Sequence, residues 1–367
     1  MPFSTGVSAS CYSWCVSAMQ SSEDKSDGGY GRFDRLLHQL ALGFSPLLEI
    51  SFDGERMFHG SAAATLTSEK PVFVTGLARA GTTVLMRMLH HGGKFASLTY
   101  RDMPFPLAPN SWARLGKRWN RSIATTERGH GDGLTHDLDT PEAIEEVFWR
   151  AFEGDRYIEK AGLVPGTPER ETLENFQLFV RLVQLRYDRA RYLSKNNNNV
   201  LRLPGLVSAF PDAVLIHPFR EPLQQAASLL NQHRRACVTQ ADDPFRRKFM
   251  TWLGHREFGL DQLPFLFADA PPGDGDRQSI NYWLQAWISV YRSLLRQQDP
   301  VSSRQLFVDF DLLCTGDSRL QAKLAKTVDA DVLPMETLAP PPPHQIEGVD
   351  RELIAAAQAL HADLRAR

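Results

Sequence analysis

The stretch VFVTGLARAGTTVLMRMLH, residues 72–90, constrains the fold more than any other part of the chain. Its apolar run VFVT suits a short buried strand, Gly76 ends that strand, and apolar residues at helical spacing begin after Thr82. A strand, a glycine-containing loop and a helix in this order are typical of an anion-binding loop, because backbone N–H groups and the start of the helix face one point. The same pattern can also be a turn that needs no ligand.

Further strand and helix patterns follow downstream. Residues 214–216 read as a buried strand, and Pro222 suits the first turn of the helix after it. The segments RYLSK at 191–195 and LFVDF at 306–310 read as two more strands. Strands that alternate with helices predict an α/β fold with a P-loop-like central parallel sheet flanked by helices, and with ligands at the carboxyl ends of the strands.

The domain organisation follows from composition and periodicity. The first segment is rich in Ser and Gly and lacks periodicity, which predicts a flexible tail. The rest reads as one domain, with helices also expected at 33–42 and 349–364. Two mostly helical stretches interrupt the sheet core and are candidates for a substrate-binding cap. The predicted boundaries are 1–31 for the tail, 32–367 for the domain, about 70–99 and 191–315 for the core, and about 100–190 and 232–300 for the helical cap segments.

Composition limits the partners and the compartment. A formal net charge of −2 provides no global basic field for a polyanion, which argues against nucleic acid as the main partner. Four cysteines are too few and too scattered for a disulfide framework, so we expect a cytoplasmic protein. The start of the chain does not resemble a signal peptide, and we expect no membrane span.

The loop departs from nucleotide triphosphate loops at one position. Thr82 stands where those loops have a lysine, and the positive charge lies three positions earlier, at Arg79. A triphosphate with magnesium needs the lysine near its β and γ phosphates, whereas a terminal phosphate with a group of lower charge does not. The loop therefore favours a monoester-like phosphate.

The segment GLARAGTT resembles the phosphosulfate-binding loop of sulfotransferases that use 3′-phosphoadenosine 5′-phosphosulfate (PAPS). In that family a strand is followed by a basic residue, a small residue and Gly-Thr-Thr. The residues that match this loop are Arg79, Ala80, Gly81, Thr82 and Thr83. The resemblance implies that they bind PAPS.

A second motif supports the resemblance. The family's segment for the 3′-phosphate is a strand that ends in Arg, followed by a helix with Ser eight residues on, and Arg220 and Ser228 fit this spacing. A guanidinium and a hydroxyl placed in this way can converge on one phosphate. Taken separately, Arg220 could instead pair with Glu221 or another acid, and Ser228 could be a small packing residue.

Two weaker similarities extend the resemblance to about residue 315. YLSKN at 192–196 is similar to a strand-end motif of bacterial and protein-tyrosine sulfotransferases, and FVDFDLL at 307–313 resembles a late strand with an acidic turn. Lys195 could also be a solvated surface lysine beside the Asn run. The glycine- and lysine-rich C-terminal motif of the classical cytosolic enzymes is absent from the sequence, which places the chain nearest the bacterial-type branch.

Sulfuryl transfer needs an acceptor placed in line with the sulfur, a base for its proton and positive charge on the leaving phosphate oxygen. Arg79 and Lys195 are predicted to supply the charge. His130, in a glycine-broken loop, is the predicted base, with Asp102 and His136 as alternatives. The polar residues of that loop could equally tie down the start of the next helix. We expect no metal, because three scattered loop ligands are a weak signal.

The predicted function is transfer of a sulfuryl group from PAPS to a hydroxyl or amine. The acceptor could be a small molecule, a saccharide, a lipid or a peptide, and the oligomeric state is not readable from the sequence. Two alternatives stay open: a P-loop kinase that uses ATP and magnesium on a small metabolite, and a nucleotide-binding protein without turnover.

Overall fold

A five-stranded sheet forms the centre of the molecule, and each of its neighbouring pairs is parallel. The computed structural model describes residues 32–116, 126–127, 135–136, 141, 143–268, 275–330 and 343–367. The predicted tail lies outside these residues. The strands run in the order β2 (Phe95–Ala96), β5 (Arg191–Lys195), β1 (Val72–Val74), β6 (Val214–Phe219) and β7 (Gln305–Asp309). The predicted parallel sheet is confirmed.

Alternate residues of each strand enter different cores, because side chains of a strand point to opposite faces. Val72 and Val74 of β1 pack in an apolar cluster with α4 (Thr82–His91), α12 (Phe310–Cys314) and α13 (Ser318–Thr327). Phe73, between them, enters the larger cluster on the opposite face. The sheet is thus covered by helices on both faces, as the continuous apolar runs predict.

The larger core is rich in aromatic rings. The ring of Phe73 lies 5.9 to 6.3 Å from those of Phe176, Tyr192 and Phe210. The helices that supply buried residues to it include α3 (Ser45–Ala64), α6 (Glu146–Tyr157), α7 (Arg170–Tyr187), α8 (Leu203–Ala209), α9 (Pro222–Asp242), α11 (Ile280–Leu295) and α14 (Arg351–Arg365). Because α7 and α11 pack in this core, parts of the predicted cap segments belong to the helical layer of the sheet.

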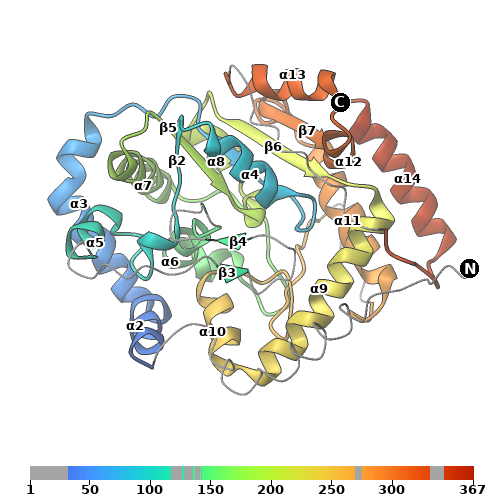
Figure 1. Cartoon of the computed structure of the whole chain (residues 1–367), viewed down its shortest axis with the longest axis horizontal. Coiled ribbons are helices and arrows are strands. Elements are labelled where there is room, and N and C mark those ends of the chain that lie inside the picture. Colours follow the sequence, from blue (N-terminus) through green and yellow to red (C-terminus); the bar gives the residue numbers. More distant parts are fainter. Residues whose placement is uncertain are drawn as a thin grey trace, which may run out of the picture.

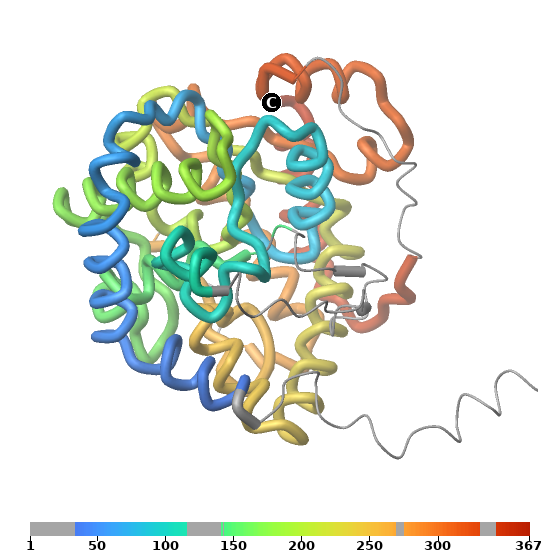
Figure 2. The backbone as a smooth tube through the Cα atoms, turned by 60° about the vertical axis from the view of Figure 1, so that its left-hand side comes forward, coloured from blue at the N-terminus to red at the C-terminus, as the bar shows by residue number. Residues whose placement is uncertain are grey.

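The remaining elements lie around this centre. Helices α2 (Arg32–Gly43), α3 and α5 (Pro109–Gly116) lie on one side of the molecule, and α13 and α14 lie on the other (Figure 1). The second view agrees, with α2 and α3 in blue far from α14 in red (Figure 2). Helix α10 (Pro244–Trp252) packs against α2 and α9, and β3 (Thr126–Glu127) pairs with β4 (Thr135–His136). The helices predicted at 33–42 and 349–364 are confirmed as α2 and α14.

The strand order makes β1 the point where the chain changes direction across the sheet. Its neighbours β5 and β6 come much later in the sequence, and Val74 stands level with both Lys195 and Ile216. In open α/β sheets ligands bind beyond the carboxyl ends of strands at such a point. The loop after β1, Lys195 and Arg220 all belong to this edge.

Candidate functional site

The loop between β1 and α4 has the backbone of an anion cradle. Gly76, Arg79 and Gly81 have positive φ angles of 152°, 66° and 81°. At Gly81 an added Cβ would lie 2.3 Å from the ring of Phe310, so only glycine fits there without rearrangement. A positive φ is uncommon for a residue with a side chain such as Arg79, and such strain is concentrated at functional sites.

The start of α4 completes the cradle. Gly81 is the N-cap residue and provides no side-chain hydrogen bond to the first turn of the helix. The positive end of the helix dipole therefore faces the loop, which favours a negatively charged ligand. Of the other residues that the sequence assigned to the loop, Ala80 and Thr82 are buried and Thr83 is partly exposed.

The two predicted phosphate motifs meet in space. The Arg79 Nε atom donates a hydrogen bond of 3.1 Å to the Ser228 hydroxyl, although the two residues are 149 positions apart. Ser228 is buried on α9. The hydroxyl of Ser228 therefore has a polar partner in the loop, which packing alone would not require.

Arg220 leaves the end of β6 and is 6% exposed. Its Nε atom donates to Asp311 Oδ1 at 3.2 Å, and the other oxygen of Asp311 accepts from the backbone N–H of Glu221. The Glu221 carboxylate instead caps α9 by accepting from the N–H of Gln224. The alternative that Arg220 pairs with an acid is thus realised with Asp311 and not with Glu221.

A third basic side chain, His344, lies near these two arginines. Its backbone N–H donates to the Gln224 side chain at 2.7 Å, which holds the segment against α9. Burial lowers the pKa of His344, and the charges of Arg220 and Arg79 lower it further. No sequence pattern indicated His344, because it lies far from both motifs along the chain.

Lys195 ends β5 and is only 9% exposed, and the four asparagines after it are all buried. The interpretation of Lys195 as a solvated surface lysine is therefore wrong. Two acidic side chains that periodicity did not indicate, Glu145 and Glu146 at the start of α6, accept hydrogen bonds from Asn196 and Asn199. A buried amide that donates to a carboxylate avoids the cost of an unpaired polar group.

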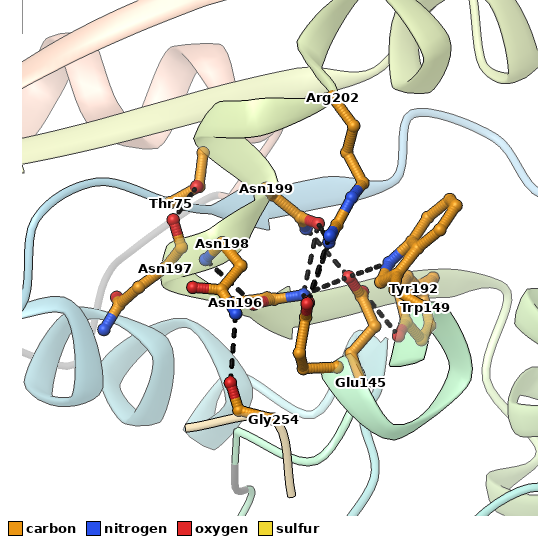
Figure 3. A network of polar contacts seen from close by, with 11 residues as sticks. Thr75, Glu145, Trp149, Tyr192, Asn196, Asn197, Asn198, Asn199, Arg202 and Gly254 are labelled. Carbon is orange, nitrogen blue, oxygen red and sulfur yellow. Dashed lines mark hydrogen bonds and ion pairs between the residues drawn. The ribbon is translucent and has the colours of Figure 1, made fainter. Parts of the chain in front are cut away.

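These asparagines and glutamates form a network at the end of β5 (Figure 3). The Asn196 side-chain amide donates to Glu146 Oε2 at 2.7 Å and to Glu145 Oε1 at 3.1 Å. Arg202 donates to both oxygens of Glu146, at 2.7 and 3.1 Å, and Tyr192 donates to Glu145. The network fixes the backbone that follows Lys195.

The charge of Lys195 acts on the carboxylate of Glu257, and His255 lies beside that carboxylate. The amide of Asn197 donates to Glu257 Oε1 at 2.9 Å, and His255 Nδ1 lies 3.5 Å from Glu257 Oε2. Burial raises the pKa of Glu257, but His255 and Lys195 outweigh this effect and bring the pKa down to about 2. Glu257 is therefore ionised at neutral pH. Sequence analysis missed both residues, because a short loop gives no periodic signal.

Of the three side chains predicted as possible bases, only that of Asp102 lies within the described residues. Asp102 is completely buried, where its Oδ2 atom accepts from the N–H of Thr99 at 2.9 Å and from the Tyr187 hydroxyl at 2.6 Å. Burial raises its pKa to about 6. Its Oδ2 atom closes a capping box with Thr99 and is engaged in structure. Its Oδ1 atom accepts no hydrogen bond from the described residues and lies 3.7 Å from Arg186 Nε. His130 and the side chain of His136 lie outside the described residues.

Within the described part of the chain, no group of three His, Cys, Asp or Glu side chains could hold a metal ion. None of the helices described there is long and apolar enough to cross a membrane.

Comparisons with solved structures find several distant similarities. Sulfotransferase STF1 from Mycobacterium tuberculosis H37Rv is 13% identical, with 87% of this chain and 79% of that chain covered and a TM-score of 0.47. Sulfotransferase STF9 from Mycobacterium avium is 15% identical, with coverage of 92% and 79% and a TM-score of 0.43. The sulfotransferase domain of the Synechococcus PCC 7002 olefin synthase is 13% identical, with coverage of 81% and 96% and a TM-score of 0.37.

No curated protein matches the chain in sequence. The family assignment depends instead on a sequence profile described as "Sulfotransferase family", which matches residues 71–263. This segment begins at β1 and includes the loop, Lys195, Arg220 and Ser228. Since the match covers over half of the chain, this protein belongs to the sulfotransferase family, and it is a transferase.

Proposed function

We propose that this enzyme transfers the sulfuryl group of PAPS to a hydroxyl or amine of an acceptor. The hydrogen bond between Arg79 and Ser228 is the observation that carries the proposal, because it joins the loop motif to the motif for the 3′-phosphate. Arg220 lies at the end of the strand that leads into the same helix. A donor with one phosphate at each end of its ribose matches two such anion sites.

The proposed reaction is an in-line displacement. The acceptor oxygen or nitrogen forms a bond to sulfur while the bond between sulfur and the bridging phosphate oxygen breaks, and adenosine 3′,5′-bisphosphate leaves. Arg79 and Lys195 stabilise the charge that grows on that oxygen, together with the N–H groups at the start of α4. The acceptor proton passes to a base. This scheme needs no metal ion.

The proposed base is one of a few side chains. His130 is our prediction from the sequence, with Asp102 and His136 as alternatives. His255 is supported by its carboxylate partner Glu257, which can orient an imidazole and which also interacts with the charge of Lys195. Substitution of the base by alanine should lower kcat by about 100-fold or more and leave the affinity for the bisphosphate unchanged. The histidine whose alanine variant keeps full kcat is not the base.

The acceptor class is open among small molecules, saccharides, lipids and peptides, and we keep the cytoplasm as the proposed compartment.

The donor site can be tested with Arg220→Ala. Loss of a charge-assisted contact should weaken binding of adenosine 3′,5′-bisphosphate by about 10-fold to 100-fold, and binding of adenosine 5′-monophosphate by less than about threefold. Arg234→Ala is a matched control, since Arg234 lies on the exposed side of α9 and donates to Gln278. Calorimetry with both nucleotides measures these affinities in the two variants. Equal losses for the two nucleotides would remove Arg220 from the 3′-phosphate site.

A further inference from the structure

Gln225 connects the two phosphate motifs. It lies on α9 between Arg220 and Ser228, and its side chain is completely buried. Its Nε2 atom donates to the carbonyl oxygens of Ala78, at 3.0 Å, and Leu77, at 3.4 Å. Its Oε1 atom accepts from the backbone N–H of Arg220 at 3.2 Å. One amide therefore holds the loop after β1 and the end of β6 at the same time.

The orientation of this amide follows from its partners. Trp287 Nε1 lies 2.9 Å from one end of the Gln225 amide, and an indole N–H can only donate. The backbone N–H of Arg220 can also only donate, so that end must be the oxygen. The NH₂ group therefore faces the carbonyl oxygens of the loop. The Tyr291 hydroxyl accepts from Gln225 and donates to Pro218 O at 2.8 Å, which fixes the arrangement further.

These bonds determine where the loop N–H groups point. In a planar trans peptide the C=O and the N–H point in opposite directions. Since the carbonyls of Leu77 and Ala78 face Gln225, the N–H groups of Ala78 and Arg79 face away from it. Gln225 thereby restrains two of the backbone donors that an anion in this loop would use.

We propose that Gln225 is a positioning residue of the phosphosulfate site, which orients the N–H groups of Ala78 and Arg79 and keeps the loop in register with Arg220. The inference that this serves PAPS rests on the proposed function. The restraint on the loop rests on the hydrogen bonds alone. A residue that only filled the core would not need to face both loop carbonyls and the N–H of Arg220.

Three variants test the role of Gln225. Gln225→Met keeps the volume and removes every hydrogen bond. Gln225→Glu keeps the acceptor but cannot donate to the loop when ionised. Trp287→Phe keeps Gln225 and removes one donor, so it gives a milder test if the first two variants fold poorly. Gln184→Met is the matched control, because Gln184 on α7 is also buried and donates to the carbonyl of Ala190, between α7 and β5 and away from the loop.

The first measurement is amide hydrogen exchange of the ligand-free proteins. In both Gln225 variants, peptides that cover residues 76–82 should exchange at least about 10-fold faster than in the wild type, with a smaller increase in Trp287→Phe. Gln184→Met should leave this segment unchanged. If the segment exchanges equally in the wild type and in the Gln225 and Trp287 variants, Gln225 does not position the loop.

The second measurement is calorimetry with adenosine 3′,5′-bisphosphate. Gln225→Met should bind at least about 10-fold more weakly than the wild type, and Gln184→Met should bind equally well. If the loop is looser in the Gln225 variants but the wild type does not bind the bisphosphate, the restraint is supported and the proposed donor is rejected. Unchanged affinity in Gln225→Met, with a binding wild type, would overturn the role of Gln225 in the site.

Discussion

At the scale of single residues, Lys195 is the side chain on which the proposed chemistry depends most. It is buried at the end of β5, level with the last residue of β1, and its charge acts on Glu257. Lys195→Met keeps most of its volume and should lower kcat by about 100-fold to 1,000-fold, as for the loss of one donor to a developing charge. The affinity for the bisphosphate should change by less than about threefold.

The control for this variant is Lys94→Met. Lys94 is exposed and donates to the carbonyl of Asp329 at 3.2 Å. Steady-state kinetics and calorimetry on the two variants distinguish a catalytic from a structural role. A parallel loss of rate and of nucleotide affinity in Lys195→Met would assign Lys195 to donor binding alone.

At the scale of elements, the junction between the loop and α4 tolerates little change. In Gly81→Ala the new methyl group meets the Phe310 ring at 2.3 Å and the backbone has a φ of 81°. We expect a loss of about 2 to 4 kcal/mol in the free energy of unfolding and weaker bisphosphate binding. Gly93→Ala has a similar φ of 71° with no heavy atom within 4 Å of the added methyl group, so it should cost only about 1 kcal/mol.

Urea unfolding of the two glycine variants measures the difference. Phe310→Leu, added to Gly81→Ala, should recover part of the stability, because a smaller side chain relieves the contact. Equal costs for Gly81→Ala and Gly93→Ala would mean that the Phe310 contact does not restrict the loop.

The helices and strands differ in how well they can be predicted from the sequence. The strands β1, β6 and β7 are predictable because continuous apolar runs mark buried parallel strands, whereas β5, RYLSK, was expected as one more strand end without such a run. The two-residue strand β2 was missed, since it is too short for a pattern. Helix α3 was missed because some of its apolar residues, namely Ile50, Met57 and Phe58, are exposed on its outer face and obscure the amphipathic pattern.

Only part of the candidate site was predictable from the sequence. Arg79, Ser228 and Arg220 belong to local motifs, so short spacings indicated them. Gln225 and Glu257 act through partners that are distant in sequence, and no local pattern records those contacts. The burial of Asn196 and Asn199 was likewise unpredictable, because these amides donate to glutamates about fifty positions away.

At the scale of the whole molecule, a buried histidine makes stability depend on pH. His217, inside β6, donates through Nδ1 to the carbonyl of Thr75 at 3.0 Å and accepts through Nε2 from the amide of Gln305 at 3.1 Å. Burial lowers its pKa to about 4, while an unfolded histidine titrates near 6.5. The unfolded chain therefore binds the proton first. The stability linked to His217 is complete above about pH 6.5 and is lost as the pH falls toward 4.

The expected loss between pH 7 and pH 5 is about 2 kcal/mol for this group. Urea unfolding of the wild type and of His217→Gln at both pH values isolates it, because the buried Asp102 and all other groups are common to both proteins. The variant, whose amide can still donate to Thr75 O, should lose about 2 kcal/mol less than the wild type. The same loss in both proteins would show that His217 does not cause it.

The central claim is that the loop binds a phosphosulfate donor and not a triphosphate. Calorimetry of the whole chain with adenosine 3′,5′-bisphosphate, and separately with ATP and magnesium, tests it most directly. The account predicts tight binding of the bisphosphate, with a Kd at least about 100-fold below that for ATP with magnesium, because Thr82 replaces the lysine that a triphosphate needs and Arg220 and Ser228 recognise the 3′-phosphate. Preference for ATP with magnesium would contradict the account and favour a kinase.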